Sequence, residues 1–259
     1  MRKLVYNLML VTVLCVAFAG VASAESTISS NVLEYDFRTG EAVAKEHVTI
    51  TRDDGSKIEA AHGSYNTKTE AGRLEGGVVA NQPDGHATCN TLVLAAGGKQ
   101  LSAIGNAVIK KQDKTLQAGQ VDYDQARGYM ETVGSWARLL LDDGSTLDAE
   151  HIDYTESSGI ANAVGNVKID SEARKLTGSG DKAIYDTKQE DGTLELIGNA
   201  KATQDGNSVA GNRLILRGAS GKSASVSEGF GNVKLVYIPR PQPAAKTKDT
   251  TEITSRAMA

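Results

Sequence analysis

Two stretches of the chain repeat one pattern: LQAGQVDYDQARGYMETVGSW at residues 116–136 and LDAEHIDYTESSGIANAVGNV at residues 147–167. Both copies place a Leu, an Ala and a Tyr at matching positions, which are Leu116, Ala118 and Tyr123 in the first copy. Periods of about 20–50 residues are typical of repeat architectures, in which one small unit stacks on the next. The fold is therefore expected to follow from a single repeated unit.

The pattern extends beyond these two copies to seven units that span residues 28–238. Its Tyr or Leu position recurs at Tyr35, Tyr65, Leu94, Tyr123, Tyr154, Tyr185 and Leu216. A second anchor, Gly-Asn followed by Val or Ala, begins at Gly105, Gly165, Gly198 and Gly231. Weaker copies begin at Gly76, Gly134 and Glu46. The seven units share one period and therefore one predicted structure.

Each unit contains two runs in which apolar residues alternate with polar ones, a pattern that predicts half-buried strands. Asp-Gly pairs at Asp54, Asp84, Asp143 and Asp205 join the runs at one end, and such pairs favour hairpin turns. Glycines at 40, 72, 98, 128, 159, 192 and 221 mark turns at the other end. Turns at both ends predict an antiparallel meander. A parallel β-helix also fits a period near 30, but it needs no reversing hairpin in each unit.

The alternation breaks once in every run. Ala118 and Val121 are three residues apart rather than two, and so are Ile104 and Ala107 in a partner run. A slip of one residue would turn the apolar side chains outward unless the strand bulges or bends there. We therefore predict an all-β fold of about 14 bent strands, whose halves face each other as an elongated roll with one apolar interior.

Three segments of different character divide the chain. Residues 1–24 combine basic Arg2 and Lys3, an apolar run and an Ala22-Ser23-Ala24 cleavage site, which predicts a secretory signal peptide; an uncleaved membrane anchor is the alternative. Residues 25–238 form the repeat domain. Residues 239–259 begin with three prolines, at 239, 241 and 243, and continue with small polar residues, which predicts a disordered tail.

Composition argues against several function classes. Without Arg2 and Lys3 the chain keeps 26 of its 28 basic residues against 32 acidic ones, so nothing favours nucleic-acid binding. The four histidines lack metal-ligand spacing, and we predict no metal, no cofactor and no catalytic set. Cys89 occupies the repeat position of Ala118, which indicates an inward apolar residue rather than a nucleophile. Three lysines at 110, 111 and 114 are candidates for phosphate contacts or an ordinary solvated turn.

The interior is the candidate functional site, either as a packed core or as an apolar groove between the two sheets that accepts acyl chains. Each buried CH₂ contributes about 0.8 kcal/mol, so acyl chains could bind without charged contacts. The candidate groove residues are Val48, Ile50, Tyr65, Leu94, Ile109, Tyr123, Trp136, Tyr154, Val167, Ile169, Tyr185, Leu216, Val233 and Leu235. The first strand, near Val32–Tyr35, and the last, near Val233–Tyr237, are expected to have open edges that invite pairing with another chain.

The motif L-x-A-x-x-[LVI]-x-Y, the glycine turn and G-N-[VA]-x-[IV] together resemble the OstA-like domain family of lipopolysaccharide-transport proteins (LptA type). The resemblance covers nearly all of residues 28–238. It implies an antiparallel β-jellyroll, or β-taco, that binds the lipid A part of lipopolysaccharide in the periplasm. It also implies head-to-tail homo-oligomers and edge-strand pairing with LptC-like inner-membrane and LptD-like outer-membrane OstA domains, which together bridge the two membranes.

Two other interpretations stay open at this point. The chain could be a membrane-anchored, LptC-like component of the same machinery, and the cleavage site at residues 22–24 argues against this. It could also be a β-helical carbohydrate-active enzyme or a structural repeat protein, which would require same-direction coils.

Overall fold

The computed structural model describes residues 26–83, 85–96, 99–111, 114–141, 144–186, 188, 193–217 and 225–238. Strands and their turns make up these residues, and we find among them no helix that could cross a membrane. The predicted signal peptide (1–24), the predicted tail (239–259) and the predicted turn residues Asp84, Gly98, Asp143, Gly192 and Gly221 lie outside them.

The strands follow one another along the chain with short connections. They are β1 (Ser26–Ser29), β2 (Val32–Asp36), β3 (Glu41–Arg52), β4 (Lys57–Asn66), β5 (Ala71–Gln82), β6 (Gly85–Ala95), β7 (Gln100–Lys111), β8 (Lys114–Asp124), β9 (Tyr129–Leu141), β10 (Thr146–Ala149), β11 (His151–Thr155), β12 (Ile160–Ser171), β13 (Leu176–Asp186), β14 (Thr193–Gln204), β15 (Asn207–Arg217), β16 (Ser225–Phe230) and β17 (Lys234–Val236).

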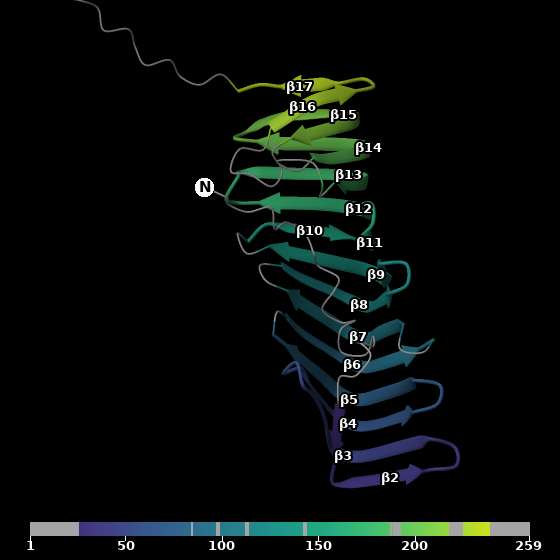
Figure 1. Cartoon of the computed structure of the whole chain (residues 1–259). Coiled ribbons are helices and arrows are strands. Elements are labelled where there is room, and N and C mark those ends of the chain that lie inside the picture. Colours follow the sequence, from purple (N-terminus) through teal and green to yellow (C-terminus); the bar gives the residue numbers. More distant parts are fainter. Residues whose placement is uncertain are drawn as a thin grey trace, which may run out of the picture.

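Each strand pairs antiparallel with its neighbours in sequence, so the sheet grows along one axis from β2 to β17 (Figure 1). Three long strands are interrupted at mid-length, which splits them into β1 and β2, β10 and β11, and β16 and β17. β1 and β2 both pair with β3, and β16 and β17 both pair with β15. Counting each split strand once, the described residues form the 14 bent strands that the repeat predicts, and a parallel β-helix is excluded.

The predicted bend is a crease in the middle of every long strand. At the β7–β8 crease Gly105 and Asn106 lie opposite the single residue Gly119, and both have positive φ. Alternate strands from β3 onward, except β9, contain two consecutive left-handed residues at the crease, and the strand paired with each has a single residue opposite them. The pairs are Glu46–His47, Gly76–Gly77, Gly105–Asn106, Gly165–Asn166, Gly198–Asn199 and Gly231–Asn232.

The crease explains why the first residue of the pair is usually Gly. A Cβ on Gly198 would lie 2.3 Å from the Asp181 carboxylate of the preceding strand, and one on Gly105 would lie 2.6 Å from Asn90.

The crease also corrects the predicted spacing of inward residues along a strand. In β7 the inward residue before the crease is Ala103 and not Ile104, so the step to Ala107 is four. Val164 and Phe230 hold the same position as Ile104, directly before the left-handed pair, and they also face outward.

The creases divide the sheet into two walls that enclose the core. The wall that we call the tyrosine wall carries one inward row, formed by cross-strand partners: Tyr35, Ala42, Tyr65, Gly72, Leu94, Leu101, Tyr123, Met130, Tyr154, Ala161, Tyr185, Leu194 and Leu216. The aliphatic wall carries the other: Ile28, Ile50, Ile58, Ala80, Ala87, Ile109, Leu116, Leu139, Leu147, Ile169, Gly178, Ala202, Val209 and Leu235.

Away from the crease, the turns of each wall form its rim. On the tyrosine wall neighbouring turns are linked by backbone hydrogen bonds, such as Thr67 N–H to Gly40 O at 2.8 Å and Glu156 N–H to Gly128 O at 2.9 Å. On the aliphatic wall Asp205 and Gly206 both have positive φ, as the predicted hairpin turn requires. The backbone pairing of the described strands runs along each wall, and the two walls are joined through the crease.

Candidate functional site

The structure brings most of the predicted groove residues together in the interior. Tyr65, Leu94, Tyr123, Tyr154, Tyr185 and Leu216 lie in the row of the tyrosine wall, and Ile50, Ile109, Ile169 and Leu235 lie in the row of the aliphatic wall. Val48 and Val167 are buried beside the crease. Residues of both walls belong to one continuous apolar cluster from Ala44 to Leu216. The walls also touch, since a Cβ on Gly178 would lie 3.2 Å from Leu196.

Three predicted groove residues do not lie in a closed interior. Trp136 is 47% exposed, whereas its neighbour Ala137 is buried, so the expected inward position of Trp136 is wrong. The reason is an extra residue in β9, where Gly134, Ser135 and Trp136 lie opposite Gly119 alone. Val233 and Leu235 belong to the last described strand region, and Leu235 is 65% exposed because none of the described strands covers it.

The tyrosine row places apolar rings inside and hydroxyl groups near the rim. The Tyr123 hydroxyl donates to the Glu156 carboxylate (3.4 Å), and the Tyr35 hydroxyl contacts Thr67 Oγ1 (3.1 Å). Burial raises the pKa of Tyr65, and the nearby Glu70 carboxylate raises it further. The raised pKa favours the protonated Tyr65 hydroxyl, and the row presents hydroxyl groups above an apolar floor.

Polar residues replace apolar ones where the aliphatic wall approaches its rim. Ser56, Lys111, Lys114, Ser145 and Ser171 are all buried there. Lys111 and Lys114 are cross-strand partners at the end of the β7–β8 hairpin. Nearby, Arg174 Nη1 donates to Ser145 Oγ at 3.2 Å, and Ser145 Oγ donates to Ser171 Oγ at 2.7 Å. The interior is thus apolar in its depth and polar along this rim, and two of the three lysines noted in the sequence are buried.

Cys89 is buried in the interior, as predicted from its repeat position. Burial raises the pKa of its thiol to about 11. A nucleophilic cysteine needs a lowered pKa, so Cys89 has the properties of a packing residue.

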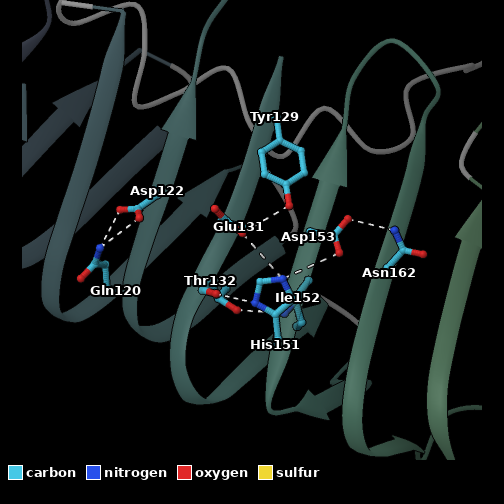
Figure 2. A network of polar contacts seen from close by, with 9 residues as sticks. All are labelled: Gln120, Asp122, Tyr129, Glu131, Thr132, His151, Ile152, Asp153 and Asn162. Carbon is cyan, nitrogen blue, oxygen red and sulfur yellow. Dashed lines mark hydrogen bonds and ion pairs between the residues drawn. The ribbon is translucent and has the colours of Figure 1, made fainter. Parts of the chain in front are cut away.

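A polar network covers the outer face of the tyrosine wall (Figure 2). Its carboxylates belong to Asp122, Glu131 and Asp153, which are cross-strand partners in one row of β8, β9 and β11. His151 Nδ1 donates to the Thr132 carbonyl at 2.6 Å, while its Nε2 lies 3.9 Å from Glu131 and 3.8 Å from Asp153 (Figure 2). No local sequence pattern predicts this network, because its members come from different strands.

The carboxylates of the network accept hydrogen bonds from neighbouring side chains. Tyr129 donates to Glu131 (3.3 Å), Asn162 donates to Asp153 (2.9 Å), and Gln120 donates to both carboxylate oxygens of Asp122 (Figure 2). In the part of the chain that the structure describes, no group of three or more His, Cys, Asp or Glu side chains has the geometry to hold a metal ion.

Comparison with known proteins gives the following relationships. Residues 88–222, about half of the chain, match a family described as LptA/(LptD N-terminal domain) LPS transport protein. Among curated proteins, none matches the chain. One similar solved structure is LptH, the LptA-homologous periplasmic component of the lipopolysaccharide transport device of Pseudomonas aeruginosa. It is 15% identical over 83% of this chain and 96% of its own, with a TM-score of 0.20, which is too low to establish a shared arrangement in space.

Proposed function

Because the chain belongs to the LptA/(LptD N-terminal domain) family of lipopolysaccharide-transport proteins, we propose that it is the periplasmic carrier that moves lipopolysaccharide between the inner and outer membranes. The family is one of transport proteins, and the chain is not an enzyme. In this proposal the interior between the two walls receives the acyl chains of lipid A. Residues 1–24 act as a cleaved export signal, so N-terminal sequencing of the exported protein should begin at Glu25.

The observation that carries the proposal is the continuous apolar interior with a polar rim. Two inward rows run the length of the sheet, and residues such as Leu116, Leu196 and Leu214 are fully buried. Burial of one CH₂ contributes about 0.8 kcal/mol, so one acyl chain of a dozen carbons would supply several kcal/mol. In this proposal the acyl chains replace contacts between the two walls, which part along their rims and stay joined through the crease.

The rims fit the polar part of the same molecule. Tyrosine hydroxyls lie on one side, and the buried Lys111 and Lys114 and the half-buried Arg174 lie on the other. Phosphates attached to a sugar could accept hydrogen bonds from these donors, while the acyl chains lie deeper. An amphipathic lipid therefore matches the gradient from an apolar floor to a polar mouth.

The ends of the sheet support assembly into a bridge. Within the described residues β2 pairs with β3 alone, and β17 pairs with β15 alone, so each has an unpaired edge there. Unpaired edges are templates for strand addition. We propose that these edges pair head to tail with further copies and with the OstA domains of LptC-like and LptD-like partners, which would extend the two inward rows from one protein to the next.

Site-specific photo-crosslinking tests the carrier function. A photoreactive residue at Ile109, Tyr154 or Val167 should crosslink to lipopolysaccharide in living cells, because these side chains face the interior. Val108 is the matched control, since it neighbours Ile109 on β7 and faces outward. Crosslinks from Val108 but not from Ile109 would contradict binding in the interior.

A further inference from the structure

The outer face of the aliphatic wall carries a polar cleft over β9, β10, β12, β13 and β14. The cleft has a volume of about 490 Å³. β13, which lies between β12 and β14, contributes only the small residues Thr177, Gly178 and Ser179, whereas β12 contributes Lys168 and β14 contributes Lys201. The cleft lies outside the interior, because Val167, Leu176 and Ala200 face inward and their neighbours along each strand face the other way.

Two lysines border the cleft on opposite sides. Lys168 of β12 and Lys201 of β14 are both in register with Ser179 of β13. Two strand spacings separate them, which is about 9.6 Å between their Cα atoms. Both side chains are exposed, and within the described residues neither forms an ion pair. Two ammonium groups that straddle a trough of small residues favour a ligand with negative charge.

Acceptors and hydroxyl groups complete the lining. Arg138 donates to both carboxylate oxygens of Asp148 (2.5 and 2.9 Å), so this pair is fixed at one side of the cleft. Asp170, Thr146 and Thr203 also line it. A lining with hydroxyls, carboxylates and ammonium groups can both donate to and accept from sugar hydroxyls. The volume lies in the range of about 300–1,000 Å³ that is typical of small-molecule sites, which favours one small ligand over a macromolecule.

We propose that this cleft binds an anionic saccharide, a sugar that bears phosphate or carboxylate groups, with Lys168 and Lys201 as the charged contacts. The saccharide part of the proposed cargo and a free anionic saccharide share this chemistry. The inference goes beyond the proposed function, because the cleft is separated from the interior by the wall itself and needs no acyl chain.

Titration of the ¹⁵N-labelled protein with fully deacylated lipopolysaccharide oligosaccharide, followed by NMR, tests the site. We expect shifts at the amides of Thr177, Ser179 and Lys201. The double variant Lys168→Ala with Lys201→Ala should bind about tenfold more weakly or worse, since one lost charged hydrogen bond is worth at least that factor. The matched control, Lys99→Ala with Lys182→Ala, removes two lysines from the tyrosine wall and should leave the affinity unchanged.

Control ligands in the same titration distinguish the possible results. A dephosphorylated oligosaccharide should bind weakly, and equal binding would overturn the requirement for charge. Inorganic phosphate that binds as tightly as the oligosaccharide would overturn the saccharide class. Shifts confined to the interior rows, or equal affinity in the Lys168/Lys201 variant, would overturn the site. Intact lipopolysaccharide added afterwards identifies the source: competition indicates its saccharide part, and simultaneous binding indicates a separate saccharide. Failure of the proposed carrier function would instead appear as loss of the Ile109 crosslink.

Discussion

At the residue scale, the crease of β3 departs from the rule of the repeat. Glu46 and His47 have φ of 63° and 56°, where other units place Gly and Asn. A left-handed non-glycine residue costs roughly 1–2 kcal/mol. Glu46 is tolerated because Asn31 lies beside it, in the break between β1 and β2. Asn31 donates hydrogen bonds to the side chain and to the backbone carbonyl of Glu46.

Replacing Glu46 by Gly should therefore stabilise the protein. We expect the free energy of unfolding to rise by about 1 kcal/mol, because Gly adopts positive φ without the steric cost of a Cβ. Urea unfolding followed by circular dichroism measures the change. Gly105→Ala is the opposite test and should destabilise, since its Cβ would lie 2.6 Å from Asn90. A loss of stability in Glu46→Gly would show that its side-chain bond to Asn31 outweighs the strain.

Cys89 gives a second prediction at this scale. Its folded pKa of about 11 exceeds the value of about 8.5 expected in the unfolded chain. The folded state therefore holds the thiol proton more tightly, and this contribution to stability is present below about pH 8.5 and is lost as the pH rises towards 11. The rate of reaction with a disulfide reagent should be low at pH 8 and should climb with pH beyond 9. An equally fast reaction of folded and urea-unfolded protein at pH 8 would contradict the burial of the thiol.

At the scale of the element, the sequence predicts the creased strand but not every crease. Period-two alternation and a break near each glycine predict antiparallel strands that bend. In β7 and β12 the predicted inward residue is one position too late, because the step of four across two left-handed residues leaves Ile104 and Val164 outside. The predicted inward position of Trp136 is wrong because Gly134-Ser135-Trp136 resembles Gly-Asn-Val, whereas the crease of β9 contains one more residue than the other creases.

The extra residue in β9 can be removed. Deletion of Ser135 together with Trp136→Asn would give β9 the Gly-Asn-Ala crease found at Gly105–Ala107 and Gly198–Ala200. We expect the variant to be at least as stable as the wild type, because the regular crease places two residues against one and removes an exposed indole. Thermal unfolding followed by circular dichroism measures this. A loss above about 2 kcal/mol, larger than an ordinary surface change, would mean that the wider crease of β9 is required by the fold.

At the scale of the whole molecule, the candidate sites were predictable to different degrees. The interior follows from the repeat, since every unit contributes the same inward positions, such as Tyr123 and Tyr154. The outer cleft does not, because it depends on which residues of β9 to β14 become neighbours across strands. Lys168 and Lys201 stand apart in the sequence and meet across Ser179 only when the register is known.

Most of the exposed apolar surface lies at the two ends of the sheet. Among the described residues, large exposed apolar side chains gather at the two ends of the sheet: Val32, Leu33, Tyr35 and Phe37 at one end, and Phe230, Val233, Leu235, Val236, Tyr237 and Ile238 at the other. Between the ends they are Val133, Trp136 and Val164. Exposed apolar residues beside an unpaired strand edge favour association with another chain.

Charges at both ends should therefore prevent self-association. Leu33→Lys with Leu235→Lys places a lysine on each terminal strand, where both wild-type side chains are more than half exposed. We expect sedimentation velocity to show concentration-dependent oligomers of the wild type and monomers of this variant, with similar unfolding temperatures, because neither side chain is part of the buried core. Val133→Lys changes an exposed apolar residue away from the ends and should leave association intact. Equal association of all three proteins would exclude end-to-end pairing through these strands, and loss of association in Val133→Lys alone would move the contact to the crease of β9.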